Sequence, residues 1–277
     1  MFYKNQTILV ATRHQKERVI GPALEQALQC KIFTPPDFDT DQFGTFCRQI
    51  KRTATAYETV IQKAKTAAQH YGYRYAIANE GSFGPHPDFF MVPGDIELIA
   101  LIDLKNGIEI IESVISTDTN YAHLDLNAGD DYSAFLKQVK FPSHGLMVKA
   151  LATGWIQKGI TDPLTLKNAI DEALEQSSQV RLETDMRALF NPSRMAVIAS
   201  AAEKLAQRLL QQCPQCNSPG FGRLTTSGKL LCEWCEAPST LYQFQLKQCV
   251  ACDYQEQSKR PDGLTNAPAR YCEYCNP

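Results

Sequence analysis

Four Cys-x-x-Cys pairs near the end of this 277-residue chain constrain its fold more than any other feature. Such spacings are typical of structural zinc sites, in which four thiolates surround one ion in a closed tetrahedron. A closed site leaves no position for a reactive water, so we expect zinc to support folding rather than catalysis. The pairs, separated by 15, 13 and 19 residues, are Cys213/Cys216, Cys232/Cys235, Cys249/Cys252 and Cys272/Cys275.

The sequence leaves open which pairs share an ion. Sequential pairing would join the first pair to the second and the third to the fourth, whereas nested and interleaved pairings use the same spacings. In each case eight thiolates predict two zinc ions. A redox role is the alternative, but four repeated pairs in a reducing compartment favour metal.

The composition changes at the first of these cysteines, which predicts two domains. Residues 1–212 are long enough to bury a core of their own, and we expect an α/β fold in which helices flank a mixed sheet. This domain is the candidate for catalysis or ligand binding. Residues 213–277 are predicted to form a small zinc-ribbon-like module.

Charge and hydropathy limit the partners. The net charge is −2, and residues 213–277 carry six basic and six acidic side chains, so the sequence predicts no nucleic-acid partner. The aromatic side chains of the module instead favour a protein partner or self-association. No run of 18 apolar residues and no leader pattern occurs, which predicts a cytoplasmic protein without membrane contact.

The loop at residues 79–87 is the first candidate for a functional site. It follows the apolar run Tyr75–Ala78, which has the length of a strand, and it contains two glycines and two prolines. Ligand crevices form at the carboxyl ends of strands in α/β proteins, so we select Glu80, Ser82 and His86. The alternative is a tight connection in which Glu80 is solvated.

A second strand-end loop lies near the start of the chain. The segment Gln6–Ala11 is predicted to be a strand, and helical periodicity follows from Val19 onward. Backbone N–H groups at a helix N-terminus favour an anion such as phosphate, although an ordinary solvated loop is the alternative. The candidate ligands of this anion are Thr12, Arg13, His14 and Lys16.

Two carboxylate-bearing segments come next. The loop from Asp37 to Asp41 has three acids of the kind that Mg²⁺ prefers, although such loops usually form only turns and caps. A helix from about Thr53 to Tyr71 then carries Glu58 and Lys63.

The segment from Asp95 to Ser116 predicts a β-hairpin. Asn106-Gly107 favours a type I′ turn, and apolar residues at nearly every position predict two central strands. The acids of this segment (Asp95, Glu97, Asp103) would need a partner or a metal if they were buried. After Asp131 we expect only helices, over residues 132–139, 146–155 and 162–176 and from Pro192 onward.

Three charged residues before the last helix form a further candidate site. Arginine binds phosphate or carboxylate through two parallel hydrogen bonds, so Asp185, Arg187 and Arg194 could contribute to ligand binding. A local ion pair at the helix entry is the alternative.

Several motifs together resemble a bacterial family of unknown function with a cysteine-rich tail. The resemblance spans nearly the whole chain and implies no activity. The motifs are Arg13–Glu17, Asn79–Pro87, Glu183–Ala188, Asn191–Arg194 and the terminal Cys-x-x-Cys pairs.

The first 120 residues also resemble the inosine-triphosphate pyrophosphatase-like enzymes. The counterparts are Thr12 with Lys16, the helical segment Glu58–Ala64 and the strand-end segment Asn79–Ser82. The resemblance implies that Lys16 and Lys63 hold phosphate oxygens, while Glu58 and Glu80 bind Mg²⁺ or orient the attacking water.

These features lead to one functional hypothesis and one competitor. The first is a Mg²⁺-assisted hydrolase of a nucleotide or another phosphorylated small molecule. The second is a non-catalytic zinc-ribbon protein that binds a partner or assembles. The hydrolase hypothesis predicts that Lys16, Lys63, Glu58 and Glu80 meet at one cleft.

Overall fold

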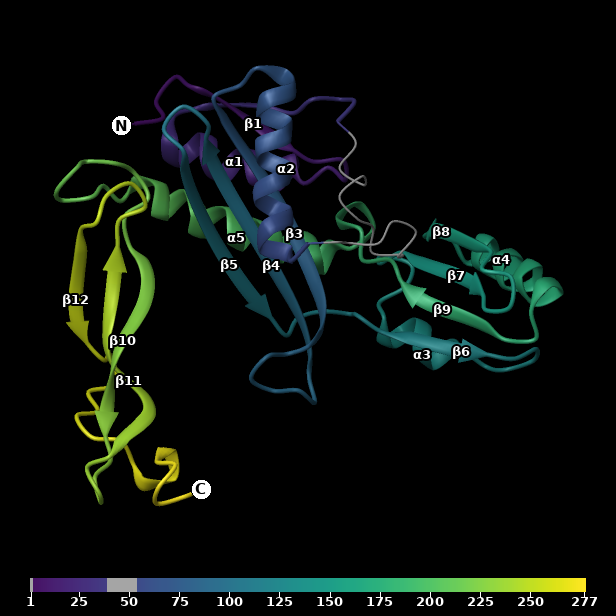
Figure 1. Ribbon diagram of the computed structural model, residues 1–277. Coiled ribbons are helices and arrows are strands. Elements are labelled where there is room, and N and C mark those ends of the chain that lie inside the picture. Colours follow the sequence, from purple (N-terminus) through teal and green to yellow (C-terminus); the bar gives the residue numbers. More distant parts are fainter. Residues whose placement is uncertain (1, 39–53) are drawn as a thin grey trace. The chain divides into compact units, whose positions relative to one another are not determined.

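The computed structural model describes residues 2–38 and 54–277, which form two compact units (Figure 1). The larger unit spans Tyr3–Ala206, and the smaller contains Gln207–Pro277 together with Phe2. Of the acidic loop predicted as a possible Mg²⁺ site, Asp39 and Asp41 lie outside the described residues. Asp37 accepts a hydrogen bond from the hydroxyl of Tyr71 at 2.7 Å.

The larger unit contains the expected mixed sheet, with strand order β2-β1-β3-β4-β5. β1 is parallel to β2 and β3, whereas β3, β4 and β5 are successively antiparallel. Because β1 ends earlier than β3, the last pairing of the two strands is Ala11 with Ala78. The strands are β1 (Thr7–Ala11), β2 (Lys31–Phe33), β3 (Tyr75–Pro85), β4 (Pro93–Asp103) and β5 (Ile108–Ser116).

Helices cover both faces of this sheet. α2 (Ala56–Tyr71) packs its alanine-rich side against Ala76 and Ala78 of β3 (Figure 1). Successive strand residues face opposite sides, so Ile77 and Asn79 face away from α2. α1 (Glu17–Leu28) and α5 (Pro192–Leu210) lie on that other face. Lys16, just before α1, contacts Asn79, and Arg194 of α5 contacts Glu97.

The predicted loop at residues 79–87 is largely strand. β3 continues to Pro85 and pairs residue by residue with β4, which starts at Pro93. The glycines did not end the strand because the partner strand satisfies its backbone groups, so the expectation of a strand end at Ala78 was wrong. The turn of this long hairpin lies at residues 86–92.

The predicted hairpin of β4 and β5 is confirmed, but its turn and position differ from the prediction. Asp103 accepts hydrogen bonds from the backbone N–H groups of Lys105 and Asn106, and Gly107 has a positive φ of 65° whereas Asn106 does not. The turn is therefore not type I′, which needs positive φ at both central residues. β4 is central, whereas β5 is an edge strand.

A second sheet of four strands occupies the region where helices alone were expected. Its order is β6-β9-β7-β8, and α3 (Ser133–Gln138) and α4 (Pro163–Gln176) accompany it. The prediction of a helix over residues 146–155 was wrong. The apolar side chains of this run are buried on both faces of β7, and the backbone of β7 pairs with β9. The strands are β6 (His123–Leu126), β7 (Leu146–Ala150), β8 (Ile156–Ile160) and β9 (Val180–Thr184).

The smaller unit is built on a three-stranded antiparallel sheet. β10 (Arg223–Leu231) pairs with β11 (Pro238–Gln248), which pairs with β12 (Gln255–Lys259). In the part of the chain that the structure describes, no helix combines the length and apolar character needed to cross a membrane.

Candidate functional site

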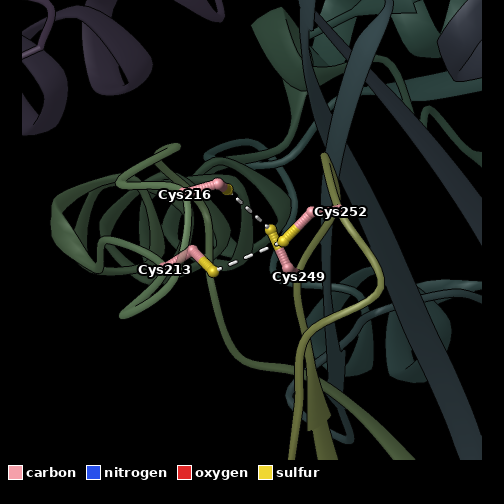
Figure 2. A group of neighbouring side chains, drawn as sticks. All are labelled: Cys213, Cys216, Cys249 and Cys252. Atoms are coloured by element: carbon pink, nitrogen blue, oxygen red, sulfur yellow. Dashed lines mark hydrogen bonds between the residues drawn. The ribbon is translucent and has the colours of Figure 1, made fainter.

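The eight cysteines of the C-terminal unit form two groups of four. Within each group the sulfur atoms lie within 4.8 Å of one another, and the closest pairs are 3.5 to 3.9 Å apart. Four thiolates at 2.3 Å around a tetrahedral ion would lie about 3.8 Å apart, so both groups fit a metal ion such as zinc. The groups are Cys213, Cys216, Cys249 and Cys252 (Figure 2), and Cys232, Cys235, Cys272 and Cys275.

The β10–β11 hairpin explains why the pairing is interleaved. The ladder joins Arg223 to Gln248 at one end and Leu231 to Pro238 at the other. The first end therefore brings the first and third Cys-x-x-Cys pairs together, and the other end carries the second pair. The fourth pair reaches that end because Ala267 bridges to Cys232.

Backbone N–H groups support the sulfur atoms of both groups. The N–H of Ala251 donates to Cys249 Sγ at 3.3 Å, and the N–H of Trp234 donates to Cys232 Sγ at 3.4 Å. Such donors stabilise thiolates, the form of cysteine that binds metal.

A buried charged centre in the larger unit surrounds two consecutive residues of β3. Lys16, just before α1, donates to Asn79 Oδ1 at 2.9 Å. Lys63 of α2 forms an ion pair with Glu80, and both side chains are almost fully buried. Asn79 and Glu80 face opposite sides of β3 and lie one and two residues beyond Ala78, the last residue of β3 that pairs with β1.

The centre extends to the neighbouring strand and to α5. Asn79 donates to Glu97 Oε2 at 2.9 Å, and Arg194 Nε donates to Glu97 Oε1 at 2.6 Å. Gly81 lies beneath this pair, because a Cβ atom there would be 2.5 Å from Arg194 Nη2 and 2.6 Å from Glu97 Oε1. Glycine is therefore required for the approach of the ion pair to β3.

The three acids of β4 have different environments. Glu97 is paired as described, and Asp103 receives two hydrogen bonds from Arg74 at 3.0 and 2.8 Å. Burial opposes the ionisation of Asp103, but the bonds from Arg74 and from the backbone lower its pKa overall. Asp95 is 0% exposed, and within residues 2–38 and 54–277 neither of its carboxylate oxygens has a hydrogen-bond donor.

The environment of Asp95 disfavours its charged form. Burial, followed by the negative charge of Glu97, raises the pKa of Asp95 from 3.8 to about 8. Lys16 and Arg194 counteract this shift only in part. Asp95 is consequently a neutral acid at pH 7 when nothing else is bound.

Glu58 lies apart from the charged centre. Its carboxylate accepts hydrogen bonds from the backbone N–H and hydroxyl of Thr55, which completes a capping box at the start of α2. The bonds from Thr55 lower the pKa of Glu58. Of the four residues expected to share a cleft, Lys16 contacts Asn79 on one face of β3, whereas Lys63 pairs with Glu80 on the opposite face.

The other candidates of the two predicted loops are more dispersed. Thr12 is buried at the end of β1, and its hydroxyl has no hydrogen-bond partner. Arg13 is exposed and His14 partly exposed in the connection to α1. Ser82 is a strand residue opposite Ile96. His86 lies in the β3–β4 turn, where its Nδ1 accepts from the N–H of Asp88 at 3.1 Å.

Asp185 and Arg187 form the local ion pair that was the alternative to ligand binding. Arg187 donates to the buried carboxylate of Asp185 through its backbone N–H, its Nε and its Nη2. The guanidinium also lies 4.6 Å from the ring centre of Phe190. Arg194 does not join this pair and instead binds Glu97 and the carbonyl of Met186.

Sequence reasoning missed a polar group at the start of α5. His144 Nε2 lies 3.1 Å from Ser193 Oγ and accepts from the backbone N–H of Ser193 at 3.3 Å. Burial and the nearby Lys140 lower the pKa of His144, so its ring is neutral at pH 7. The histidine thus caps the first turn of α5 across 49 residues of sequence, a contact that no local pattern indicates.

A mostly apolar pocket of about 420 Å³ lies between the first turns of α1 and α5. Lys16 and Arg194 of the charged centre are sequence neighbours of lining residues. The pocket is lined by Gln15, Arg18, Val19, Ala188, Leu189, Pro192, Met195 and Ala196.

Comparisons with known proteins give a family but no activity. A family described as a domain of unknown function, DUF6671, matches residues 63–277. No curated protein matches the chain. Among solved structures, the crystal structure of protein VC0702 from Vibrio cholerae is similar at 9% identity with a TM-score of 0.31. That match covers 71% of this chain and 90% of the other, and it is too distant to inform the fold or the function.

Proposed function

Since the chain belongs to the DUF6671 family, whose description names no activity, we propose a function from the site itself. The larger unit is a Mg²⁺-assisted hydrolase of a nucleotide or another phosphorylated small molecule. The observation that carries this proposal is the burial of Lys16 and Lys63 beside Asn79 and Glu80, immediately beyond the end of β1.

Buried lysines beside a strand end suit phosphate chemistry. Ammonium groups neutralise the charge that develops on phosphate oxygens during phosphoryl transfer, and a carboxylate can orient water or hold Mg²⁺. We assign Lys16 and Lys63 to the phosphate oxygens and Glu80 to the water or the metal. Because Lys63 and Glu80 neutralise each other in the free protein, the incoming phosphate and Mg²⁺ would each replace one partner of this ion pair.

We assign the body of the substrate to the pocket between α1 and α5, which Lys16, Lys63 and Glu80 do not line. Its volume of about 420 Å³ is within the usual range of small-molecule sites, and Arg18 adds a positive charge to an apolar lining. An apolar wall with one cation suits a nucleoside or a similar body that carries phosphate. Arg13, His14 and Thr12 remain candidates for further phosphate contacts.

A substrate panel tests the hydrolase proposal. Nucleoside triphosphates and phosphate monoesters would be assayed with Mg²⁺ or Mn²⁺, and we expect turnover that Glu80→Gln and Lys63→Met each reduce by at least about a hundredfold. Lys65→Met is the matched control, because Lys65 lies on the same helix and pairs with Glu109 at the surface. Absence of turnover, or turnover unchanged in Glu80→Gln, would refute the proposal.

We also propose that the two four-cysteine groups hold zinc in a zinc-ribbon-like module, and that the protein is cytoplasmic, where thiols stay reduced. The fit of the sulfur distances to a tetrahedral ion supports zinc. Elemental analysis of protein purified without chelator should give about two zinc ions per chain. Reduced protein that contains none would contradict this assignment.

A second candidate function is partner binding or self-association through the smaller unit. Trp234 and Tyr274 lie inside Cys-x-x-Cys pairs of the same metal group and are 74% and 83% exposed. Exposed aromatic side chains are typical anchors of protein interfaces. Analytical ultracentrifugation would detect self-association that Trp234→Ala weakens. A monomer at all concentrations would exclude assembly.

A further inference from the structure

Asp95 is the unsatisfied member of the three buried acids of β4. Glu97 and Asp103 each have an arginine partner, whereas both oxygens of Asp95 are without a donor at 0% exposure. A buried carboxylate without a partner costs several kcal/mol, so such groups are protonated or bind a cation. This environment therefore favours a positively charged ligand bound directly to the carboxyl of Asp95.

The geometry of β4 places a second carboxylate beside Asp95. Asp95 and Glu97 are two residues apart on one strand, so their side chains leave the same face about 6.6 Å apart at the backbone. The two groups also interact, because the negative charge of Glu97 acts on the carboxyl of Asp95. Two oxygen ligands that converge in this way suit a hard divalent cation.

The remaining side chains of the centre hold Glu97 in place. Arg194 and Asn79 bind one oxygen of Glu97 each, and Gly81 leaves space for this arrangement. Each carboxylate oxygen has a second lone pair, so these bonds leave Glu97 able to ligate a metal. Lys16 also acts on Asp95 electrostatically, which places a cation and the acid pair in one centre.

We propose that Asp95 and Glu97 bind a divalent cation, Mg²⁺ or Mn²⁺. The proposal rests on the hydrolase function above and names the ligands of its metal, which neither Glu58 nor Glu80 alone would provide. The positive charges of Lys16 and Arg194 oppose the cation in the free protein. A phosphate that binds these side chains would offset this repulsion, so metal and phosphorylated substrate should bind cooperatively.

Direct metal binding tests the proposal without any assay of turnover. Zinc-loaded full-length protein would be titrated with Mn²⁺ at pH 7 and free Mn²⁺ followed by electron paramagnetic resonance, with and without inorganic phosphate. We expect one saturable site per chain, tightened by phosphate. Asp95→Asn should weaken binding by at least about tenfold.

The controls separate this site from other causes. Asp103→Asn removes a buried acid of the same strand that already has a partner, so Mn²⁺ binding should not change. Asp95→Asn replaces a neutral acid by a neutral amide of the same shape, and circular dichroism should confirm that this variant folds.

Three results would overturn the proposal: no saturable Mn²⁺ site, binding unchanged in Asp95→Asn, or an equal loss in Asp103→Asn. A protein that binds Mn²⁺ through Asp95 but turns over no substrate would retain the site and refute the hydrolase function. The two ideas can therefore fail separately.

Discussion

Replacing Asp95 by asparagine should change how the stability of the larger unit depends on pH. The pKa of Asp95 is about 8 in the folded protein, against 3.8 as its ordinary value. Between these pH values the folded state binds more protons than the unfolded state. Stability consequently falls as pH rises, and the linkage relation gives the slope. The variant lacks this titration, because an amide does not ionise.

The size of the effect follows from the two pKa values. Each tenfold change in an equilibrium constant corresponds to about 1.4 kcal/mol, so the full shift amounts to about 6 kcal/mol and the part between pH 5 and pH 8 to about 4 kcal/mol. This is a large fraction of the stability of a typical domain. We therefore expect Asp95→Asn to become more stable relative to wild type as pH rises, by up to about 4 kcal/mol between pH 5 and pH 8.

Urea denaturation of both proteins at pH 5, 6.5 and 8, in buffer free of added divalent cations, measures this difference. Titration of groups far from Asp95 is common to both proteins and cancels in the comparison. The reasoning would be refuted if the stability difference between variant and wild type were the same at pH 5 and pH 8. Added Mg²⁺ should raise the stability of wild type at pH 8 more than that of the variant, because the variant lacks the Asp95 carboxylate as a ligand.

Three further perturbations probe other parts of the molecule. Gly81→Ala places a methyl group against the Arg194–Glu97 pair and should lower the free energy of unfolding, measured by urea denaturation, by about 1 to 3 kcal/mol. A decrease below about 0.5 kcal/mol would show that the ion pair can move. Arg194→Ala leaves Glu97 buried without its arginine partner and should cost about 3 to 5 kcal/mol in the same measurement. A strong chelator should unfold the Gln207–Pro277 unit and leave the Tyr3–Ala206 unit folded. Hydrogen exchange resolved along the chain would measure this difference. An equal loss of protection from exchange in both units would contradict the prediction.

Local sequence patterns determined the helices and the metal ligands. Thr55 with Glu58 starts α2 and Gly72 ends it, and Asp162 with Pro163 starts α4, because caps and proline act within one turn. The Cys-x-x-Cys spacing likewise identified all eight cysteines of the two groups that could hold a metal ion, since a knuckle that presents two thiolates is a local structure.

Patterns of strand residues were less informative. The run of apolar residues before Trp155 predicted a helix but forms β7, because a short apolar run fits either element and the partner strand β9 decides between them. In the same way the glycines of residues 81–84 indicated a loop, whereas pairing with β4 keeps them in a strand.

The charged centre and the pairing of the metal groups required the tertiary structure. The sequence proposed Lys16, Lys63 and Glu80, but it could not show that Glu97 binds Arg194 across 97 residues or that Asp95 has no partner. It also left the cysteine pairing open, which the β10–β11 ladder decides. The physical reason is the same in each case. Side-chain identity and local spacing fix which groups can bind a charge or a metal, whereas strand pairing and burial fix which of them meet and which charges remain uncompensated.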